Sequence, residues 1–226
     1  MSPVDKWGPS PFTGFQPLEA KINDVNAQSA PTQQQTQPPR AQRADAKRNV
    51  ELLLEAARIA IARDGPDASL DDIARDAGVG SGTLYRHFPT RVALLEAVYR
   101  DEVQRLCAEG DRLLDSDADP GDALSEWLRA YVTFGAMKRG LMGPLTTTLG
   151  QDSGLFATCK TMVMTTGGRL VERAQESGAI REDVELTDVL TLASAIAHAG
   201  ELTREGSGLS ERLLAVAIDG LRRPGS

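Results

Sequence analysis

The residues with the richest binding chemistry lie in one short stretch, residues 81–91. Hydroxyl groups, a phenol, an imidazole and two guanidinium groups follow one another closely there. Such side chains donate hydrogen bonds to phosphate oxygens and to base edges, and arginine pairs with guanine through two parallel hydrogen bonds. The stretch therefore indicates contact with a nucleic acid, provided that the chain presents it on an exposed element.

Residues for catalysis or metal binding are scarce. The chain has two histidines, His87 and His198, and two cysteines, Cys107 and Cys159, all far apart in sequence. No nucleophile stands beside a base, no glycine-rich phosphate loop follows a strand, and no histidine pair has metal-ligand spacing. The cysteine spacing excludes a disulfide framework and a structural zinc site, and fits a reducing compartment. We therefore predict no catalytic residue, no metal and no cofactor.

A second group of residues could form a cavity for an apolar ligand. Aromatic and methionine side chains cluster between residues 127 and 164, and methionine adapts to irregular ligand shapes. Ordinary core packing is the alternative for each of them, and His198 could be either a buried, satisfied histidine or a ligand contact. The candidate ligand-binding residues are Trp127, Tyr131, Phe134, Met137, Met142, Phe156, Met162 and His198.

The elements that position residues 81–91 are short helices. Apolar residues between 43 and 64 recur at helical spacing, and Gly65-Pro66 ends that helix. Ser69 is expected to cap a second helix that stops at Gly78, where glycine tolerates positive φ. Ser81 is expected to cap a third helix that ends at His87, and Thr90 a fourth. Two short helices joined through glycine and preceded by a long helix predict a helix-turn-helix.

The rest of the chain also has helical periodicity, and no strand-like alternation persists. Helices are expected near 101–115, 122–137, 154–177, 186–200 and 210–222, with breaks at Asp119-Pro120-Gly121, Gly143-Pro144 and Gly206 to Gly208. The first 40 residues hold 7 of the 12 prolines and a glutamine-rich run, which predicts disorder. We therefore predict an all-α protein with a disordered extension over 1–40.

The overall charge neither indicates nor excludes a nucleic-acid partner. The net charge is −7, but residues 40–100 contribute +1 from 10 basic and 9 acidic side chains. Net charge governs solubility rather than a local binding face. No apolar run is long enough to span a membrane, and no secretion core begins the chain. We therefore expect a cytoplasmic protein without a membrane partner.

The stretch from Ser69 to Arg91, SLDDIARDAGVGSGTLYRHFPTR, resembles the DNA-binding signature of TetR-family transcriptional regulators. The run Thr83-Leu84-Tyr85-Arg86-His87-Phe88 makes the match specific. The resemblance is strong over 43–100, only architectural over 101–226, and absent from 1–40. It implies a helix-turn-helix domain over 41–100, which includes the linking fourth helix. It also implies a helical ligand-binding and dimerisation bundle over 101–226.

Residue roles follow from the resemblance and from the chemistry of each group. The third helix would enter the major groove, with Gly82 allowing close approach, Thr83 touching a base, and Arg86 contacting guanine or phosphate. Tyr85 and His87 would hold phosphates, as the matching family positions do. Helix N-termini attract phosphate, although capping alone explains the hydroxyl residues there. The candidate DNA-binding residues are Ser69, Ser81, Gly82, Thr83, Tyr85, Arg86, His87, Thr90, Arg91, Arg43 and Lys47.

Three functions remain open from the sequence. The first is a homodimeric repressor that binds a palindromic, inverted-repeat operator in double-stranded DNA and is released by an unidentified small-molecule effector. The helices near 186–200 and 210–222, rich in small residues, would form its dimer interface or pack within one chain. The alternatives are an enzyme or a protein-interaction module that uses the C-terminal helical pocket. Arg43 and Lys47 would form a basic arm along the DNA, or simply a solvated helix start.

Overall fold

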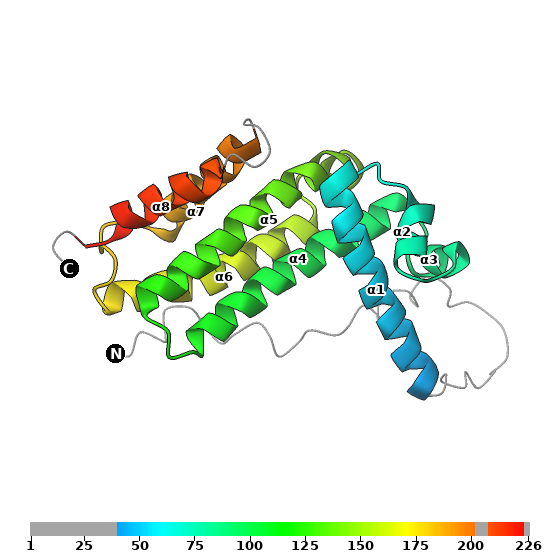
Figure 1. Ribbon diagram of the computed structural model, residues 1–226, viewed down its shortest axis with the longest axis horizontal. Helices are drawn as coiled ribbons and strands as arrows, with labels where there is room; N and C mark the ends of the chain where they lie inside the picture. Colours follow the sequence, from blue (N-terminus) through cyan, green and yellow to red (C-terminus); the bar gives the residue numbers. More distant parts are fainter. Residues whose placement is uncertain (1–39, 202–207, 224–226) are drawn as a thin grey trace. The chain divides into compact units, whose positions relative to one another are not determined.

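The computed structural model describes residues 40–201 and 208–223, and over these residues the chain is helical (Figure 1). The predicted extension over 1–40 falls almost entirely outside the described residues. Within them the structure has an isolated bridge between Ile180 and Arg222 but no strand, which confirms the predicted all-α class. The helices are α1 (Arg40–Asp64), α2 (Leu70–Asp76), α3 (Ser81–His87), α4 (Arg91–Leu114), α5 (Pro120–Leu149), α6 (Gly154–Glu176), α7 (Leu186–Glu201) and α8 (Leu209–Leu221).

The predicted helix-turn-helix is present, and its glycines explain where the helices end. Gly65 after α1 and Gly78 after α2 have φ of 80° and 69°, in the left-handed region that favours glycine. The hydroxyl oxygen of Ser69 accepts from the amide of Asp72 at 3.3 Å, which confirms its predicted role as the cap of α2. The expected cap of α3 is wrong. Ser81 is the first helical residue, because the Gly80 carbonyl already accepts helical hydrogen bonds.

Helix α4 is a single element that runs from the helix-turn-helix to the C-terminal helices. The sequence pattern suggests two segments, one to Tyr99 and one from Asp101, but the structure has no break between Arg91 and Leu114. The two predicted stripes join into one row of buried side chains along the helix. Helix α4 packs against α1, α5 and α6, and the expected domain boundary at residues 100 and 101 falls inside it. Any displacement of α4 therefore affects both the helix-turn-helix and the C-terminal helices.

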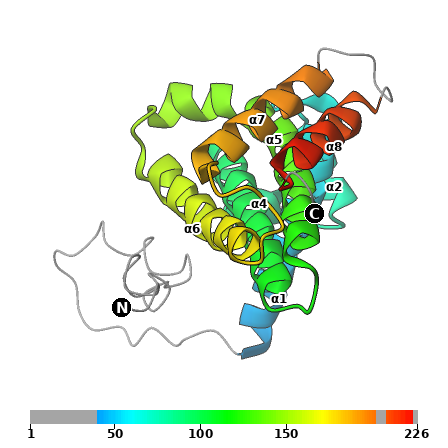
Figure 2. The same cartoon turned by 90° about the vertical axis from the view of Figure 1, so that its left-hand side faces the viewer.

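Helix α5 is longer than the sequence predicts, because it continues through Gly143-Pro144 to Leu149. Proline removes the amide that would bond to the carbonyl four residues earlier, and this normally ends or kinks a helix. Packing outweighs the loss here, since Leu141 and Leu145 on either side are completely buried. Figure 2 shows the lime-green end of α5 turning away from the body of the helix, as expected of a kink at proline.

The core of the C-terminal bundle is built around Trp127 of α5, which is fully buried. Its indole Nε1 donates to the Leu106 carbonyl of α4 at 3.1 Å, so its single donor is satisfied. Two glycines make room for the ring. A Cβ on Gly110 of α4 would collide with the side chain of Thr166 and touch the indole, and one on Gly167 of α6 would lie 2.6 Å from Trp127 Cη2. These contacts fix α4, α5 and α6 side by side.

Helices α7 and α8 lie next to each other, and α7 packs against α5 (Figures 1 and 2). The amide of Arg181, which precedes α7, donates to the Leu221 carbonyl at the end of α8 at 2.9 Å. Large apolar side chains remain outside this packing, since Leu192 is 45% exposed and Val216 is 70% exposed. No helix of the described residues has the length and hydropathy that a membrane span requires.

Candidate nucleic-acid interface

Helix α3 presents its polar side chains outward. Leu84 is completely buried and anchors the helix, whereas Tyr85 is 47% exposed and Arg86 is exposed beside it. Ser81, Thr83 and His87 are half-buried at the edges of this face. The face therefore has the composition of a contact surface, with a phenol and a guanidinium available to a partner.

Gly82 lies at the exposed start of the same helix. A Cβ built on it would meet no heavy atom within 4 Å, so nothing inside the chain requires glycine at this position. Glycine in a helix costs about 1 kcal/mol relative to alanine. Internal packing therefore does not explain the glycine, and close approach to DNA stays a prediction for this position.

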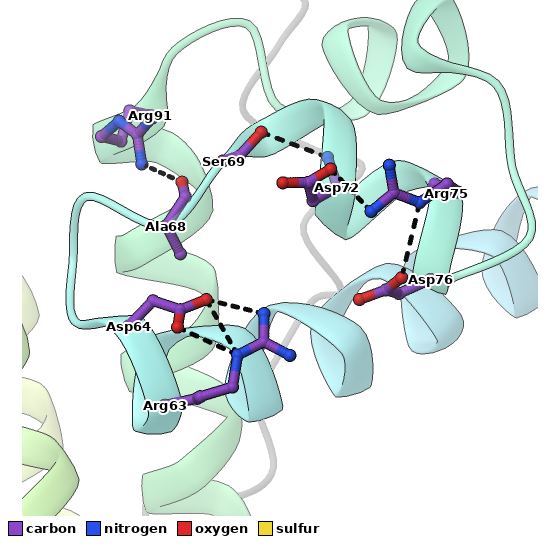
Figure 3. Close-up of polar contacts among 8 residues, drawn as sticks. All are labelled: Arg63, Asp64, Ala68, Ser69, Asp72, Arg75, Asp76 and Arg91. Atoms are coloured by element: carbon purple, nitrogen blue, oxygen red, sulfur yellow. Dashed lines mark hydrogen bonds and ion pairs between the residues drawn. The ribbon is translucent and has the colours of Figure 1, made fainter.

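Arg86 of α3 differs from two arginines of the neighbouring helices, which form ion pairs. Arg75 of α2 pairs with Asp72 at 2.7 Å and lies 3.9 Å from Asp76, and Arg63 at the end of α1 pairs with Asp64 at 2.6 Å (Figure 3). Within each pair the arginine and the aspartate neutralise each other's charge, and these side chains lie on an exposed surface. Within the described part of the chain Arg86 makes no ion pair, so its charge is available to an anion.

His87 is the last residue of α3, and the pKa of its imidazole is shifted. Burial, helped by the neighbouring charge of Arg86, lowers the pKa of the His87 imidazole below its ordinary value of 6.5. The ring is therefore neutral at pH 7 and can donate one N–H, but it does not add a positive charge. Its ring centroid lies 6.4 Å from that of Phe88, which is buried.

The two hydroxyl residues at helix starts serve as caps. Thr90 caps α4, its hydroxyl oxygen accepting from the amide of Ala93 at 3.1 Å, as predicted. Both Ser69 and Thr90 are exposed, so capping leaves each helix N-terminus open to an anion. The structure thus fits the capping role and leaves the phosphate role as a prediction.

Arg91 has a structural role that the sequence does not reveal. Its Nη1 donates to the carbonyl oxygens of Ala68 at 2.6 Å and of Pro66 at 3.0 Å, and Figure 3 shows the side chain reaching across to Ala68. These carbonyls belong to the loop between α1 and α2. Arg91 therefore ties that loop to the first turn of α4, and its guanidinium is only partly available to a phosphate.

The predicted basic arm lies at the start of α1. The Lys47 ammonium is 3.9 Å from the Glu51 carboxylate, and both side chains are largely exposed, so this ion pair adds little stability. The side chain of Arg43 lies outside the described residues. A role of the arm in DNA binding stays a prediction.

The aromatic residues among the predicted ligand residues form one cluster in the C-terminal bundle. Trp127, Tyr131 and Phe134 follow one another along α5, with centroids 5.8 Å and 6.2 Å apart for successive pairs. Tyr99 of α4 links this row to Phe156 of α6, lying 6.1 Å from Phe134 and 5.9 Å from Phe156. The helical periodicity of the sequence predicts that Tyr99 is buried, but it does not predict its contacts with Phe134 and Phe156. Met137, Met142 and Met162 are partly buried against the core.

Two observations bear on the predicted ligand site. His198 is exposed on α7 rather than enclosed in the bundle, whereas Ala193 and Ala197 in the same alanine-rich stretch are buried. A cavity of about 280 Å³ lies elsewhere, between the start of α5, Ala179 and Ile180, and the end of α8. None of the predicted ligand residues lines that cavity.

The cysteines behave as buried apolar residues. Burial raises the pKa of the Cys107 thiol to about 11 and also raises that of Cys159. Both thiols are therefore protonated at neutral pH and poor nucleophiles. Within the ranges 40–201 and 208–223, no group of His, Cys, Asp and Glu side chains has the arrangement of a metal site.

Comparison with known proteins agrees with this architecture. The family of bacterial regulatory proteins named after TetR matches residues 53–98, and the SbtR-like transcriptional regulator C-terminal domain matches residues 119–223. Among solved structures, the TetR transcriptional regulator SCO0520 from Streptomyces coelicolor is 36% identical with a TM-score of 0.69. The similarity covers 77% of this chain and 99% of that one.

Two further relatives extend the comparison. A TetR transcription regulatory protein from Mycobacterium vanbaalenii is 35% identical with a TM-score of 0.65, covering 80% of this chain and 99% of that one. The transcriptional repressor LfrR from Mycolicibacterium smegmatis is 39% identical over 77 residues, which are 34% of this chain and 40% of that protein. The chain thus spans about two fifths of the length of this curated relative.

Proposed function

Because the chain belongs to the TetR family of transcriptional regulators, and is therefore a DNA-binding regulator rather than an enzyme, we propose the following specific function. The protein binds an inverted-repeat operator as a homodimer, represses the adjacent promoter, and leaves the DNA when a small apolar molecule binds the C-terminal bundle. It acts on the chromosome, in the cytoplasm. The observation that carries this proposal is the exposed face of α3, where Gly82, Tyr85 and Arg86 face solvent on a helix held by the buried Leu84.

Helix α3 acts as the recognition helix. Its first residues, Ser81 to Thr83, enter the major groove, where the missing side chain of Gly82 lets the backbone approach the base edges. Arg86 contacts a guanine or a phosphate, and Tyr85 and His87 donate to phosphates on the flanking strand. The amides at the starts of α2 and α4, next to Ser69 and Thr90, bind further phosphates. Arg43 and Lys47 extend this contact along the backbone.

The dimer forms through α7 and α8. Their outer surface combines large apolar side chains, Leu192 and Val216, with the exposed small residues Ala195 and Ala215, a composition that permits close helix packing. A two-fold axis through this surface gives the two recognition helices a fixed separation. For successive major grooves on one side of the duplex, that separation is about 34–36 Å. His198 lies on this outer surface of α7, so its role is at the interface or at a ligand site shared with it.

Release is a shift between two states of the dimer. The ligand occupies the region of Tyr99, Tyr131, Phe134 and Phe156, and it prefers the state whose recognition helices fit the two grooves poorly. Two connections carry the change to the DNA reader. Helix α5 contacts α1, and Arg91 fastens the loop between α1 and α2 to α4.

The test uses the full-length protein and the inverted repeats in the DNA flanking its gene. Fluorescence anisotropy with labelled duplexes should show palindrome-selective binding that weakens steeply with salt, because Lys and Arg contacts release counterions. Arg86→Ala and Tyr85→Ala should weaken binding without altering thermal stability, since both side chains are exposed. Binding that ignores the palindrome, or that both variants leave unchanged, contradicts the assignment of α3 as the recognition helix.

A further inference from the structure

A lysine occupies the buried stripe of α5. The residues of this stripe recur at helical spacing, every three or four positions. Trp127, Phe134, Leu141 and Leu145 in it are buried, and Tyr131 is half-buried. Lys138 falls between Phe134 and Leu141 in the same register, four residues after one and three before the other. The periodicity thus calls for an apolar side chain where the chain has an amine, and Lys138 is half-buried there.

Lys138 has no acidic partner among the described residues. No carboxylate forms an ion pair with it, and burial lowers its pKa from the ordinary 10.5, opposed only by the nearby Cys159. The Cys159 thiol cannot neutralise it, because burial raises the pKa of that thiol and keeps it protonated. Glu96 and Arg100, which also act on Cys159, pair with each other at 2.9 Å.

Partial burial of an unpaired ammonium costs desolvation free energy, so the position of Lys138 requires an explanation. Lysines with long stems often reach solvent with the ammonium while the stem covers apolar surface. That explanation requires only a lysine at the edge of the core. It does not explain why the amine stands one turn from Phe134, in the row that carries the aromatic cluster with Tyr99 and Phe156.

We propose that Lys138 binds the anionic head group of the effector, and that the effector is an apolar molecule with a single carboxylate. The apolar body lies among Tyr99, Phe134 and Phe156, and the carboxylate pairs with the ammonium at the end of that cluster. The inference rests on the proposed regulation by a ligand in the C-terminal bundle and assigns the ligand a chemical class. A cationic or neutral ligand would leave the ammonium unpaired, and a cationic one would be repelled.

The segment after Lys138 is suited to yield when such a ligand enters. Gly140, Gly143 and Pro144 lie within the next two turns of α5, and glycine and proline are the weakest helix formers, by about 1 and 3 kcal/mol. The neighbouring Met137 and Met142 are partly buried, unbranched and adaptable. Entry of a ligand can therefore reshape α5, and α5 contacts α1 of the helix-turn-helix domain.

The experiment measures ligand binding and DNA release separately, on the full-length protein. The probes are a matched set with one apolar body: 4-phenylbutanoate, 4-phenylbutanol and 4-phenylbutylamine, together with decanoate, decanol and decylamine. Direct binding is followed by calorimetry and by the fluorescence of the tryptophans, and DNA release by anisotropy of the labelled operator. The variants are Lys138→Met, Lys138→Arg and, as a matched control, Lys160→Met on the exposed side of α6.

We expect the acids to bind the wild-type protein more tightly than the alcohols and the amines. Lys138→Met should weaken binding of the acids about tenfold or more, as loss of one charge-assisted contact does, and leave the alcohols unchanged. Lys138→Arg should keep the preference for acids, and Lys160→Met should alter nothing. In the absence of any probe, Lys138→Met should raise the Tm, since methionine suits the buried stripe better than an unpaired ammonium.

The outcomes separate this inference from the function on which it rests. Binding of no acid, equal binding of acids and alcohols, or an unchanged acid preference in Lys138→Met overturns the role of Lys138, whatever happens at the operator. Operator release by an alcohol or amine alone would overturn it while preserving regulation by a ligand. Acids that bind through Lys138 without weakening the operator complex would preserve the site and contradict the proposed release mechanism.

Discussion

Replacing Arg91 by methionine should separate its structural role from a direct contact with DNA. The guanidinium donates to the carbonyl oxygens of Pro66 and Ala68. A hydrogen bond with a charged donor contributes about 1.5–3 kcal/mol, and partial burial favours the lower end, so the loss of both costs about 3 kcal/mol. At about 2–4 °C per kcal/mol for a chain of this size, the Tm should fall by about 6–12 °C.

The assay combines thermal unfolding with the salt dependence of operator binding. Each phosphate contact that a variant loses reduces the slope of log K against log salt by about 0.9. If Arg91 acts by fastening the loop between α1 and α2, Arg91→Met should lower the Tm and weaken the operator complex with little change in slope. Arg91→Lys should recover part of both losses, since an ammonium can donate to one of the carbonyls.

Arg86→Ala provides the comparison, because Arg86 is exposed and makes no ion pair within the described part of the chain. Its loss should leave the Tm within about 2 °C, as surface substitutions usually do, and reduce the slope if the contact is to phosphate. The reasoning for Arg91 is refuted if Arg91→Met keeps its Tm and loses about 0.9 in slope. That result would make Arg91 a phosphate contact whose bonds to the loop add no stability.

Three further predictions concern the core and its ionisable groups. Gly167→Ala should lower the free energy of unfolding by about 1–3 kcal/mol, because the new methyl group would lie 2.6 Å from the Trp127 ring. Gly168→Ala should not lower it, because a Cβ there meets open space. Chemical denaturation of the two variants tests the difference. Glu102→Gln should raise the Tm at pH 7 and lose this advantage near pH 4. Burial raises the pKa of the Glu102 carboxyl above 4.5 despite the opposing charges of Arg58, whose Nε lies 3.7 Å from Oε1, and of Arg105. This oxygen has no hydrogen-bond partner, so the ionised form destabilises the fold as pH rises through the raised pKa. Cys107 should resist a thiol reagent in the native protein at pH 8 and react once urea unfolds the chain, since its pKa is about 11; rapid native labelling would contradict its burial.

The sequence predicts the DNA-reading unit well because local chemistry determines it. Ser69 and Thr90 cap their helices through their own side chains, and Gly78 turns the chain where only glycine is unstrained. These effects act within a few residues, so they are visible in the order of the residues. The same reasoning places α3 within one residue of its observed start.

Features that depend on tertiary packing were not predictable in the same way. Pro144 should end a helix, yet the burial of its neighbours keeps α5 continuous. Arg91 has the appearance of a phosphate ligand, and only the fold brings the carbonyls of Pro66 and Ala68 within reach. The exposure of His198 depends on which side of α7 meets α5. The aromatic residues were predicted to cluster, but the joining role of Tyr99 required three helices to be placed together.

The energy of release sets a requirement on the body of the effector. Raising the released fraction of the dimer from about 1% to 99% requires that the effector bind the released state about 5.5 kcal/mol more favourably than the DNA-binding state. With two bound molecules per dimer, each must supply about 2.8 kcal/mol. A charge-assisted contact at Lys138 contributes about 1.5 kcal/mol at the lower end of its range. The remaining ~1.3 kcal/mol corresponds to about 50 Å² of apolar surface, or nearly two methylene groups, buried only in the released state.

A series of straight-chain acids tests this division of the energy. Each added methylene buried only in the released state contributes about 0.8 kcal/mol per bound molecule. The release equilibrium should therefore shift about fourfold per carbon for each bound molecule, or about fifteenfold for two, until the aromatic cluster is filled. Acetate should bind weakly and leave the operator complex intact, since the head group alone cannot supply the difference. If acetate releases the DNA as well as decanoate does at equal occupancy, the head group suffices, and the aromatic residues around Tyr99 and Phe134 serve only as core.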